Sequence, residues 1–144
     1  MPYDKAQYAA RIRAASAFEL VIINYELFLI TVEDAIESPE AVPLVRRARA
    51  FLHELIVSLD MESQLAENLY PLYIYVNKLL SECTVKKNNV KLEEVRKIMS
   101  SLLDAWKEAG KKQGKELNEF YENVSYSRKG LSENTVDSGA DYKI

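Results

Sequence analysis

The stretch SAFELVIINYELFLITVEDAIE, residues 16–37, decides the fold of this chain. Ser16 can cap the start of a helix with its hydroxyl, and Glu19, three residues later, completes a capping box. From there to Glu37, apolar residues recur at the three-and-four spacing of a helix, and the stretch contains neither glycine nor proline. It therefore predicts one long helix from Ser16 to about Glu37.

This predicted helix is apolar on two opposite faces. Leu20, Ile23, Leu27 and Ile30 form a narrow stripe, which we call the outer stripe. With a rotation of about 100° per residue around the helix axis, a broader apolar face lies about 180° from the outer stripe. This broader face suits a bundle core. Leaving the four outer side chains in water would forgo about 6 to 12 kcal/mol, so something should cover them. The broader face comprises Phe18, Val21, Ile22, Tyr25, Phe28, Leu29, Val32, Ala35 and Ile36.

Three further helices are expected before residue 110. The first is expected to begin at Ser38-Pro39, where the serine can cap the helix and the proline occupies its first turn. Pro43 can delay the regular start to that position. This helix is expected to end at Leu59. The second begins with Asp60 as its cap and contains Pro71, which predicts a kink. A polar turn at 86–89 precedes the third. The apolar stripe of the second helix is Met61, Leu65, Leu69, Leu72, Val76, Leu79 and Cys83, and that of the third is Leu92, Val95, Met99, Leu102, Trp106 and Ala109.

All four glycines lie beyond residue 109, and Gly110 is expected to close the last of these helices. We therefore predict an all-α fold, an antiparallel up-down four-helix bundle over residues 16–109. An N-terminal arm, residues 1–15, precedes it. A C-terminal extension, residues 110–144, follows as a short helix near 116–124 and then a mobile tail.

Length and composition fit a single cytosolic domain. The chain has 144 residues, of which 48% are apolar and 28% charged, close to the globular average. No apolar run reaches the roughly 18 residues that span a bilayer, and the N-terminus lacks the layout of a secretory signal. The formal net charge of -3 disfavours a general affinity for phosphate backbones. We expect a cytoplasmic protein with no nucleic-acid partner and no membrane insertion.

Residues that could carry chemistry are few. His53 is the only histidine and Cys83 the only cysteine, so neither a di-iron site with Glu-x-x-His pairs nor a zinc knuckle can be assembled. His53 fits the boundary of its helix, and Cys83 falls in phase with an apolar stripe. No glycine-rich phosphate loop occurs before residue 110. We expect no catalysis, no metal and no cofactor.

Charge is distributed unevenly around the first helix. No basic residue lies between Arg13 and Arg46, and three acids crowd the C-terminal end of the helix, where the helix dipole disfavours them. Arg46, Arg47 and Arg49 on the neighbouring helix can offset these acids. The acidic residues of this interval are Glu19, Glu26, Glu33, Asp34, Glu37 and Glu40.

Two kinds of cover are open for the outer stripe. The chain itself can supply it, through Tyr3, Tyr8 and Ile12 of the N-terminal arm, or through Phe120 and Tyr121 of the extension. A protein partner can supply it instead, and the two can compete.

A second apolar surface supports the partner hypothesis. Tyr70 and Ile74 project roughly 100° or more from the predicted apolar stripe of their helix, beside Pro71. Tyrosine and large aliphatic residues are typical of interface centres. We therefore expect Leu20, Ile23, Leu27, Ile30, Tyr70 and Ile74 to bind a partner.

The ordered set of residues across the chain resembles the flagellar secretion chaperone family, FliS, over about residues 3 to 109. The resemblance rests on Ser16, Glu19-Leu20-Val21, Tyr25, Leu55, Leu59-Asp60-Met61, Leu65-Ala66, Asn68-Leu69, Leu72-Tyr73, Tyr75, Leu92-Glu93-Glu94-Val95 and Ala105-Trp106.

The resemblance implies an antiparallel four-helix bundle that binds the C-terminal segment of flagellin in the cytosol. Such a chaperone prevents premature polymerisation and accompanies its client to the export gate. It also implies that the N-terminal arm lies over part of the client surface when no client is bound.

Some positions depart from the family pattern. Asn24-Tyr25-Glu26-Leu27 stands where the family has Leu-Tyr-Asp-Gly, and Tyr70 and Ile74 stand where polar residues are common. One hypothesis that follows from these differences is that this chain binds a different client from other members of the family. Two other functions remain open: a homodimeric helical scaffold, and a regulatory adaptor that sequesters another flagellar or transcriptional factor. We expect a monomer or a weak homodimer.

Overall fold

The computed structural model describes residues 4–85 and 88–127, with side chains described up to residue 112. The helices are α1 (Lys5–Ala14), α2 (Ala17–Glu37), α3 (Val42–Val57), α4 (Gln64–Val85) and α5 (Asn89–Ser127). No strand occurs in this part of the chain. The predicted all-α class is confirmed. Among the described residues, none of the helices combines the length and apolar composition that crossing a bilayer requires.

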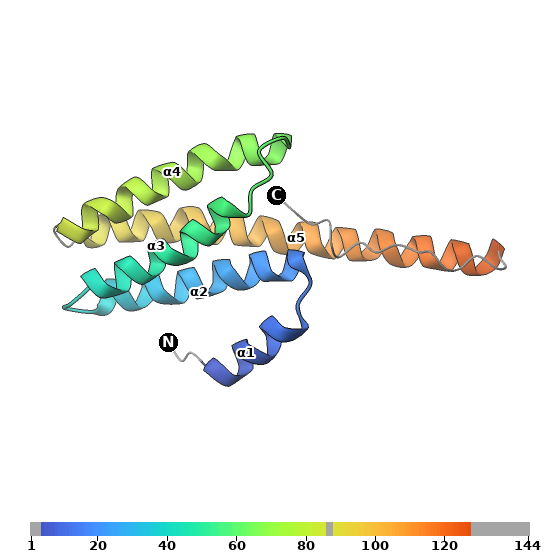
Figure 1. The fold of residues 1–144 in the computed structure, drawn as a ribbon, viewed down its shortest axis with the longest axis horizontal. Helices are drawn as coiled ribbons and strands as arrows, with labels where there is room; N and C mark the ends of the chain where they lie inside the picture. Colours follow the sequence, from blue (N-terminus) through green and yellow to red (C-terminus); the bar gives the residue numbers. More distant parts are fainter. Residues whose placement is uncertain (1–3, 86–87, 128–144) are drawn as a thin grey trace.

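Helices α2 to α5 pack side by side, and the chain reverses direction at each connection between them (Figure 1). Helix α2 contacts both α3 and α5, and α4 contacts both α3 and α5. Helix α1 lies outside this group and, among the described helices, contacts α2 alone. The arm predicted for residues 1–15 is therefore helical over most of its length.

Helix starts follow the local sequence closely at α2 and less closely at α4. The Ser16 hydroxyl accepts the Glu19 backbone N–H at 3.1 Å, as predicted for the start of α2. The Asp60 carboxylate caps only a turn, since it accepts the Glu62 N–H at 3.1 Å, and α4 begins at Gln64. There the Ser63 hydroxyl accepts the Ala66 N–H at 3.1 Å. The prediction that Asp60 caps this helix was wrong, because Ser63 offers a competing hydroxyl three residues later.

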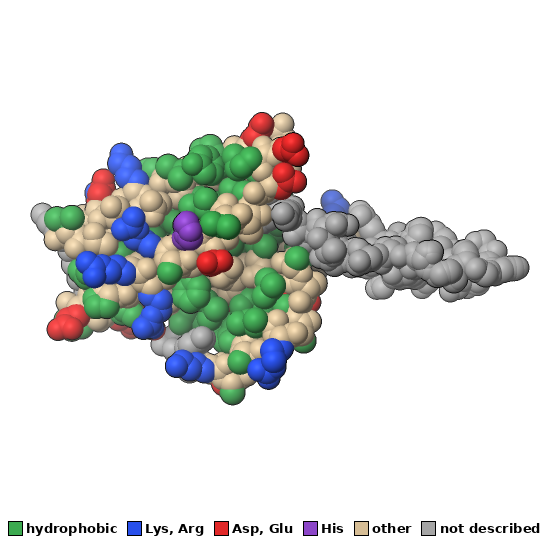
Figure 2. Space-filling model, in the orientation of Figure 1, with side chains coloured by type: hydrophobic (Ala, Val, Ile, Leu, Met, Phe, Trp, Pro, Cys, Tyr) green, Lys and Arg blue, Asp and Glu red, His purple; other side chains and the backbone are tan. Residues whose placement is uncertain are grey.

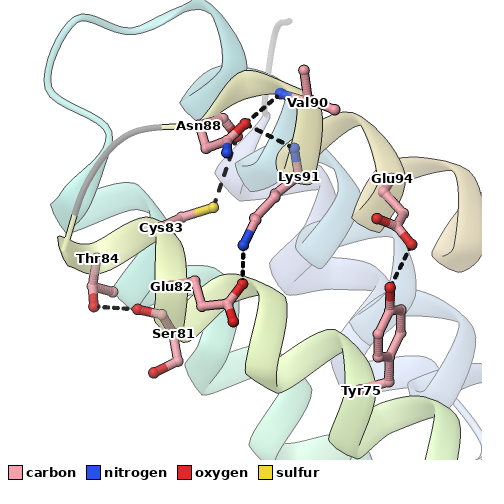
Figure 3. A network of polar contacts seen from close by, with 9 residues as sticks. All are labelled: Tyr75, Ser81, Glu82, Cys83, Thr84, Asn88, Val90, Lys91 and Glu94. Atoms are coloured by element: carbon pink, nitrogen blue, oxygen red, sulfur yellow. Dashed lines mark hydrogen bonds and ion pairs between the residues drawn. The ribbon is translucent and has the colours of Figure 1, made fainter.

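The turn between α4 and α5 is held by polar contacts from both helices (Figure 3). The Asn88 carboxamide oxygen accepts the backbone N–H groups of Val90 and Lys91 and so caps α5. The Lys91 ammonium pairs with Glu82 on α4, and the Tyr75 hydroxyl donates to Glu94 at 2.6 Å. These contacts fix the end of α4 against the start of α5.

The bundle core includes a buried pair of hydroxyls. Tyr25 of α2 and Tyr73 of α4 are both fully buried, and their hydroxyl oxygens lie 2.5 Å apart. Burial raises the pKa of both phenols above their ordinary value. A buried tyrosine needs a partner for its hydroxyl, and here one of the two phenols donates a hydrogen bond to the other. The pair therefore joins diagonally placed helices across the centre of the bundle.

Tyr73 also sets which face of α4 is inside. The sequence prediction placed Met61, Leu65 and Leu72 in the core, and all three are exposed. The prediction was wrong because the predicted stripe left out Tyr73, which is buried and has a polar partner in the core. Helix α4 passes through Pro71 without ending. The buried residues of α4 are Ala66, Leu69, Tyr73, Val76, Leu79, Leu80 and Cys83.

Helix α5 does not end at Gly110, contrary to the sequence prediction, and continues to Ser127. A Cβ placed on Gly110 would lie 2.8 Å from Cε1 of the Phe18 ring. The same ring packs edge-on against Trp106, one turn earlier on α5, with centroids 5.7 Å apart. Gly110 therefore makes room for Phe18, at the cost of about 1 kcal/mol of helix propensity. The predicted mobile tail falls largely on residues 128–144, which lie outside the described residues.

The tyrosine pair predicts a loss of stability in alkali. The folded state keeps both phenols protonated above pH 10, whereas the unfolded chain ionises them near their ordinary pKa of about 10. The contribution of the two phenols to the free energy of unfolding is fully present below about pH 10. Above that pH it decreases by at most about 1.4 kcal/mol per pH unit for each tyrosine. Urea unfolding of wild type and of the Tyr25→Phe, Tyr73→Phe double variant, from pH 8 to 11, measures this. Parallel curves for the two proteins would contradict it.

Candidate partner-binding site

The outer stripe of α2 is buried in its middle and open at one end. Ile23 is 2% exposed and Leu27 is also buried, yet neither belongs to the contiguous core cluster of the bundle. Leu20 remains 39% exposed, and Ile30 is half-buried. The stripe is thus shielded by something other than the bundle core.

Helix α1 supplies part of this shield by running back along α2. Only Ala15 and Ser16 separate the two helices, and α1 ends with an Ala15 N–H bond to the Ile12 carbonyl at 3.3 Å. Lys5, at the other end of α1, lines a hollow with Leu27 and Ile30 of the outer stripe. We call this the α1–α2 hollow; its remaining lining residues are Thr31, Asp34, Arg47 and Phe51.

One carboxylate ties the arm to the bundle. Glu26 of α2 accepts the Tyr8 hydroxyl at 3.3 Å and the Arg11 guanidinium at 2.7 Å, both from α1. Its second oxygen lies 3.6 Å from the Lys107 ammonium of α5. Arg11 also lies over the Tyr8 ring, 5.1 Å from its centroid. We call Glu26, Tyr8, Arg11 and Lys107 the Glu26 cluster.

The electrostatics of the cluster agree with this geometry. Burial and the nearby Glu26 carboxylate raise the pKa of Tyr8, so its hydroxyl stays protonated and can donate. The hydrogen bond to Glu26 raises the pKa of the Arg11 guanidinium. The side chain of Glu26 is only 18% exposed, so its contacts are screened less than those of a surface ion pair.

The arm is held more by these polar contacts than by packing. None of the residues of α1 is buried. Tyr8 is half-buried, Ile12 is 43% exposed, and Tyr3 lies outside the described residues. A helix with little buried apolar surface has a low free energy of local opening. Little buried apolar surface therefore opposes displacement of the arm.

The second predicted apolar surface is exposed on α4. Tyr70 is 40% exposed and Ile74 is 42% exposed. Helix α3 lies between α2 and α4, so the α1–α2 hollow and these two residues are separated by the width of one helix. Figure 2 shows hydrophobic side chains gathered over α4 and again between α3 and α1, on one face of the molecule.

Sequence reasoning missed the contribution of α3 to this face. Phe51 and Arg47 line the α1–α2 hollow together with the outer stripe. Phe51 lies beside, and not within, the buried face of α3, a position that its spacing from Ala48, Leu52 and Leu55 could have indicated. Leu65, Leu72 and Tyr75 of α4 are likewise exposed, although two of them were assigned to the core.

The residues considered for chemistry do not gather at this surface. Within the described residues, no three His, Cys, Asp or Glu side chains are grouped so that they could hold a metal ion. Cys83 is buried in the core, and burial raises the pKa of its thiol. An apolar stripe beneath a weakly packed helix instead matches the grooves that receive amphipathic helices.

Comparison with known proteins agrees with this geometry. A family model described as Flagellar protein FliS matches residues 1–113. The chain belongs to the FliS family. The match includes α1 and the whole of the bundle, so the arm and its contacts with α2 fall within the FliS region.

A curated relative supports the same membership. The Flagellar secretion chaperone FliS of Escherichia coli (strain K12) is 31% identical to this chain over 90 residues. The alignment covers 61% of this chain and 64% of the relative, which is less than two thirds of that protein's length.

Loss of the Glu26 charge should release the arm. In Glu26→Gln the arm loses the Arg11 ion pair, so the bonds after Arg11 and Arg13 should become more accessible to trypsin, with cleavage about two- to fivefold faster. Limited proteolysis followed by mass spectrometry measures this. Glu93→Gln, which removes an ion pair with Arg96 on α5, is the matched control and should leave the rate unchanged. Equal cleavage of both variants and wild type would contradict the role of Glu26.

Proposed function

We propose that this FliS family member is a cytoplasmic, non-catalytic export chaperone that binds the C-terminal segment of flagellin and prevents its premature polymerisation. One observation carries the proposal: the apolar outer stripe of α2 lies outside the bundle core, under a helix with no buried residue. A bundle that needed the stripe for its own stability would include it in the core.

The client and the arm compete for the same surface in this proposal. An amphipathic client helix would place its apolar face on Ile23 and Leu27 and displace α1. The client segment folds as it binds, so part of the interaction energy offsets its ordering. Leu20, already exposed, provides the first contact, and Tyr70 and Ile74 extend the surface across the same face. Once loaded, the complex would be presented to an export gate component.

Removal of the arm tests this competition. Deletion of residues 1–13 should raise the affinity for the C-terminal segment of the flagellin of the same organism by about fivefold or more, because no cover then has to be displaced. Isothermal titration with the isolated segment measures both affinities. An unchanged affinity would remove the arm from the mechanism. No binding by either form would overturn the flagellin assignment.

A charge inside the outer stripe tests the site itself. Ile23→Glu, made in the chain lacking residues 1–13, should weaken flagellin binding about 30-fold or more, the size expected of an interface centre. Val57→Glu, at an exposed position at the end of α3, is the matched control and should bind normally. Circular dichroism should show unchanged helix content in both variants. Unfolding of the Ile23 variant alone would place Ile23 in the core and contradict the proposal.

Light scattering separates the proposal from a scaffold. A chaperone of this kind should be a monomer or weak homodimer that forms a one-to-one complex with the flagellin segment. A tight dimer that excludes the segment would favour the scaffold, and retention of a different flagellar or transcriptional factor without flagellin would favour the adaptor.

A further inference from the structure

A second hollow lies between α3 and α4, on the side of α3 away from the α1–α2 hollow. We call it the α3–α4 hollow. Its lining contains two guanidinium groups, an imidazole and a carboxamide, and no Asp or Glu. The lining residues are Arg46, Arg49, Ala50, His53, Ile56 and Asn77.

The arginines of this hollow have no acidic partner in the part of the chain that the structure describes. The ion pairs there involve Arg11, Lys91, Arg96, Lys107 and Lys111 as cations. Arg49 is held in place differently, since its Nε–H donates to the Asn77 carboxamide oxygen at 3.1 Å. Among the described residues no carboxylate lies within ion-pair distance of its guanidinium, and Arg46 beside it is exposed.

The sequence predicts that Arg46, Arg47 and Arg49 offset the acids at the end of α2. Within the described residues, none of the ion pairs joins these arginines to Glu33 or Glu37. Arg47 lines the α1–α2 hollow together with Asp34, whereas Arg46 and Arg49 line the α3–α4 hollow. Helix α3 thus separates the three arginines onto two sides.

The α3–α4 hollow changes from cationic to apolar along its length. Arg46, Arg49, His53 and Ile56 recur at spacings of three and four and share one face of α3. On α4, Asn77, Ile74 and Tyr70 recur in the same way.

Helices α3 and α4 run in opposite directions, and the hydrogen bond between Arg49 and Asn77 fixes their register. Ile56, two turns after Arg49, is therefore on the same level as Tyr70 and Ile74, which precede Asn77. Figure 2 shows Lys and Arg side chains over α3 and hydrophobic side chains over the adjacent part of α4. Tyr70 and Ile74 do not line the hollow itself but lie beyond its Ile56 end. A ligand that extends past this end would therefore meet cations first and apolar side chains after them.

We infer that the α3–α4 hollow binds an acidic amphipathic helix of the protein client, with its carboxylates toward Arg46 and Arg49 and its apolar residues toward Tyr70 and Ile74. The inference rests on the proposed function, because it names the chemistry of a client segment at that surface. Charge complementarity selects this occupant, since unpaired arginines favour carboxylates and the apolar end favours a protein helix.

The rest of the surface limits where such a segment can lie. The acids at the end of α2 repel it, and the net charge of -3 disfavours a nucleic acid, which presents charge without matching apolar residues. The α3–α4 hollow therefore sets the direction of the client as well as part of its affinity.

Charge reversal in the full chain tests the inference. Arg46→Glu with Arg49→Glu should weaken binding of the flagellin C-terminal segment about tenfold at low salt and reduce its salt dependence. Lys97→Glu with Lys112→Glu on α5 makes the same change in net charge at exposed positions outside the hollow, and should stay within about twofold of wild type. Titration calorimetry at two salt concentrations measures both, with circular dichroism to check folding.

The outcomes separate this inference from the proposed function. Equal binding by wild type and the arginine variant would overturn the acidic-helix inference and leave the flagellin proposal standing. Absence of binding by wild type would overturn the flagellin proposal first. If the arginine variant lost binding only to anionic vesicles or to an RNA oligonucleotide, the occupant would be a different polyanion and the inference would be wrong.

Discussion

Helix α2 has to satisfy two packing surfaces at once, and the rest of the structure depends on that constraint. Its broad face supplies Tyr25, Phe28 and Val32 to the core, all fully buried. Its outer stripe points away from the core and has to be shielded by α1 and the edge of α3. Because a helix with apolar residues on opposite sides cannot bury both in one four-helix bundle, the fold requires a cover outside the bundle.

The two surfaces of α2 are held by different forces. Inside, the buried Tyr25 and Tyr73 hydroxyls are hydrogen-bonded to each other, which favours a single arrangement of the helices. Outside, the arm is held by a partly exposed carboxylate and by side chains that are not buried. Breaking a buried polar pair leaves unsatisfied groups in the core, whereas the groups of a polar contact at the surface can bond to water when a competing ligand separates them. The same helix thus anchors the bundle and presents a site that can be vacated.

The sequence predicted the all-α class, the start and end of α2 and the burial of Cys83, because these follow from local spacing and capping. It also predicted that the outer stripe requires a cover. It did not predict the buried face of α4, which depends on a hydroxyl partner 48 residues away in the chain. Gly110 was interpreted as a helix end, although its role is set by the Phe18 ring from another helix. The α3 side chains of the site were missed for the same reason, since only the packed structure brings Phe51 beside Leu27.

The short connection between α1 and α2 has a consequence for how long any guest stays bound. Ala15 and Ser16 alone join the arm to the helix it covers, so a dislodged arm stays tethered beside its binding surface. Its effective concentration there is on the order of millimolar, whatever the abundance of the protein. Under the proposed function, a departing client would be replaced by this intramolecular competitor before another chain could arrive. The arm would then restore the covered state without any further protein, and a client would have to outcompete a rival that never diffuses away.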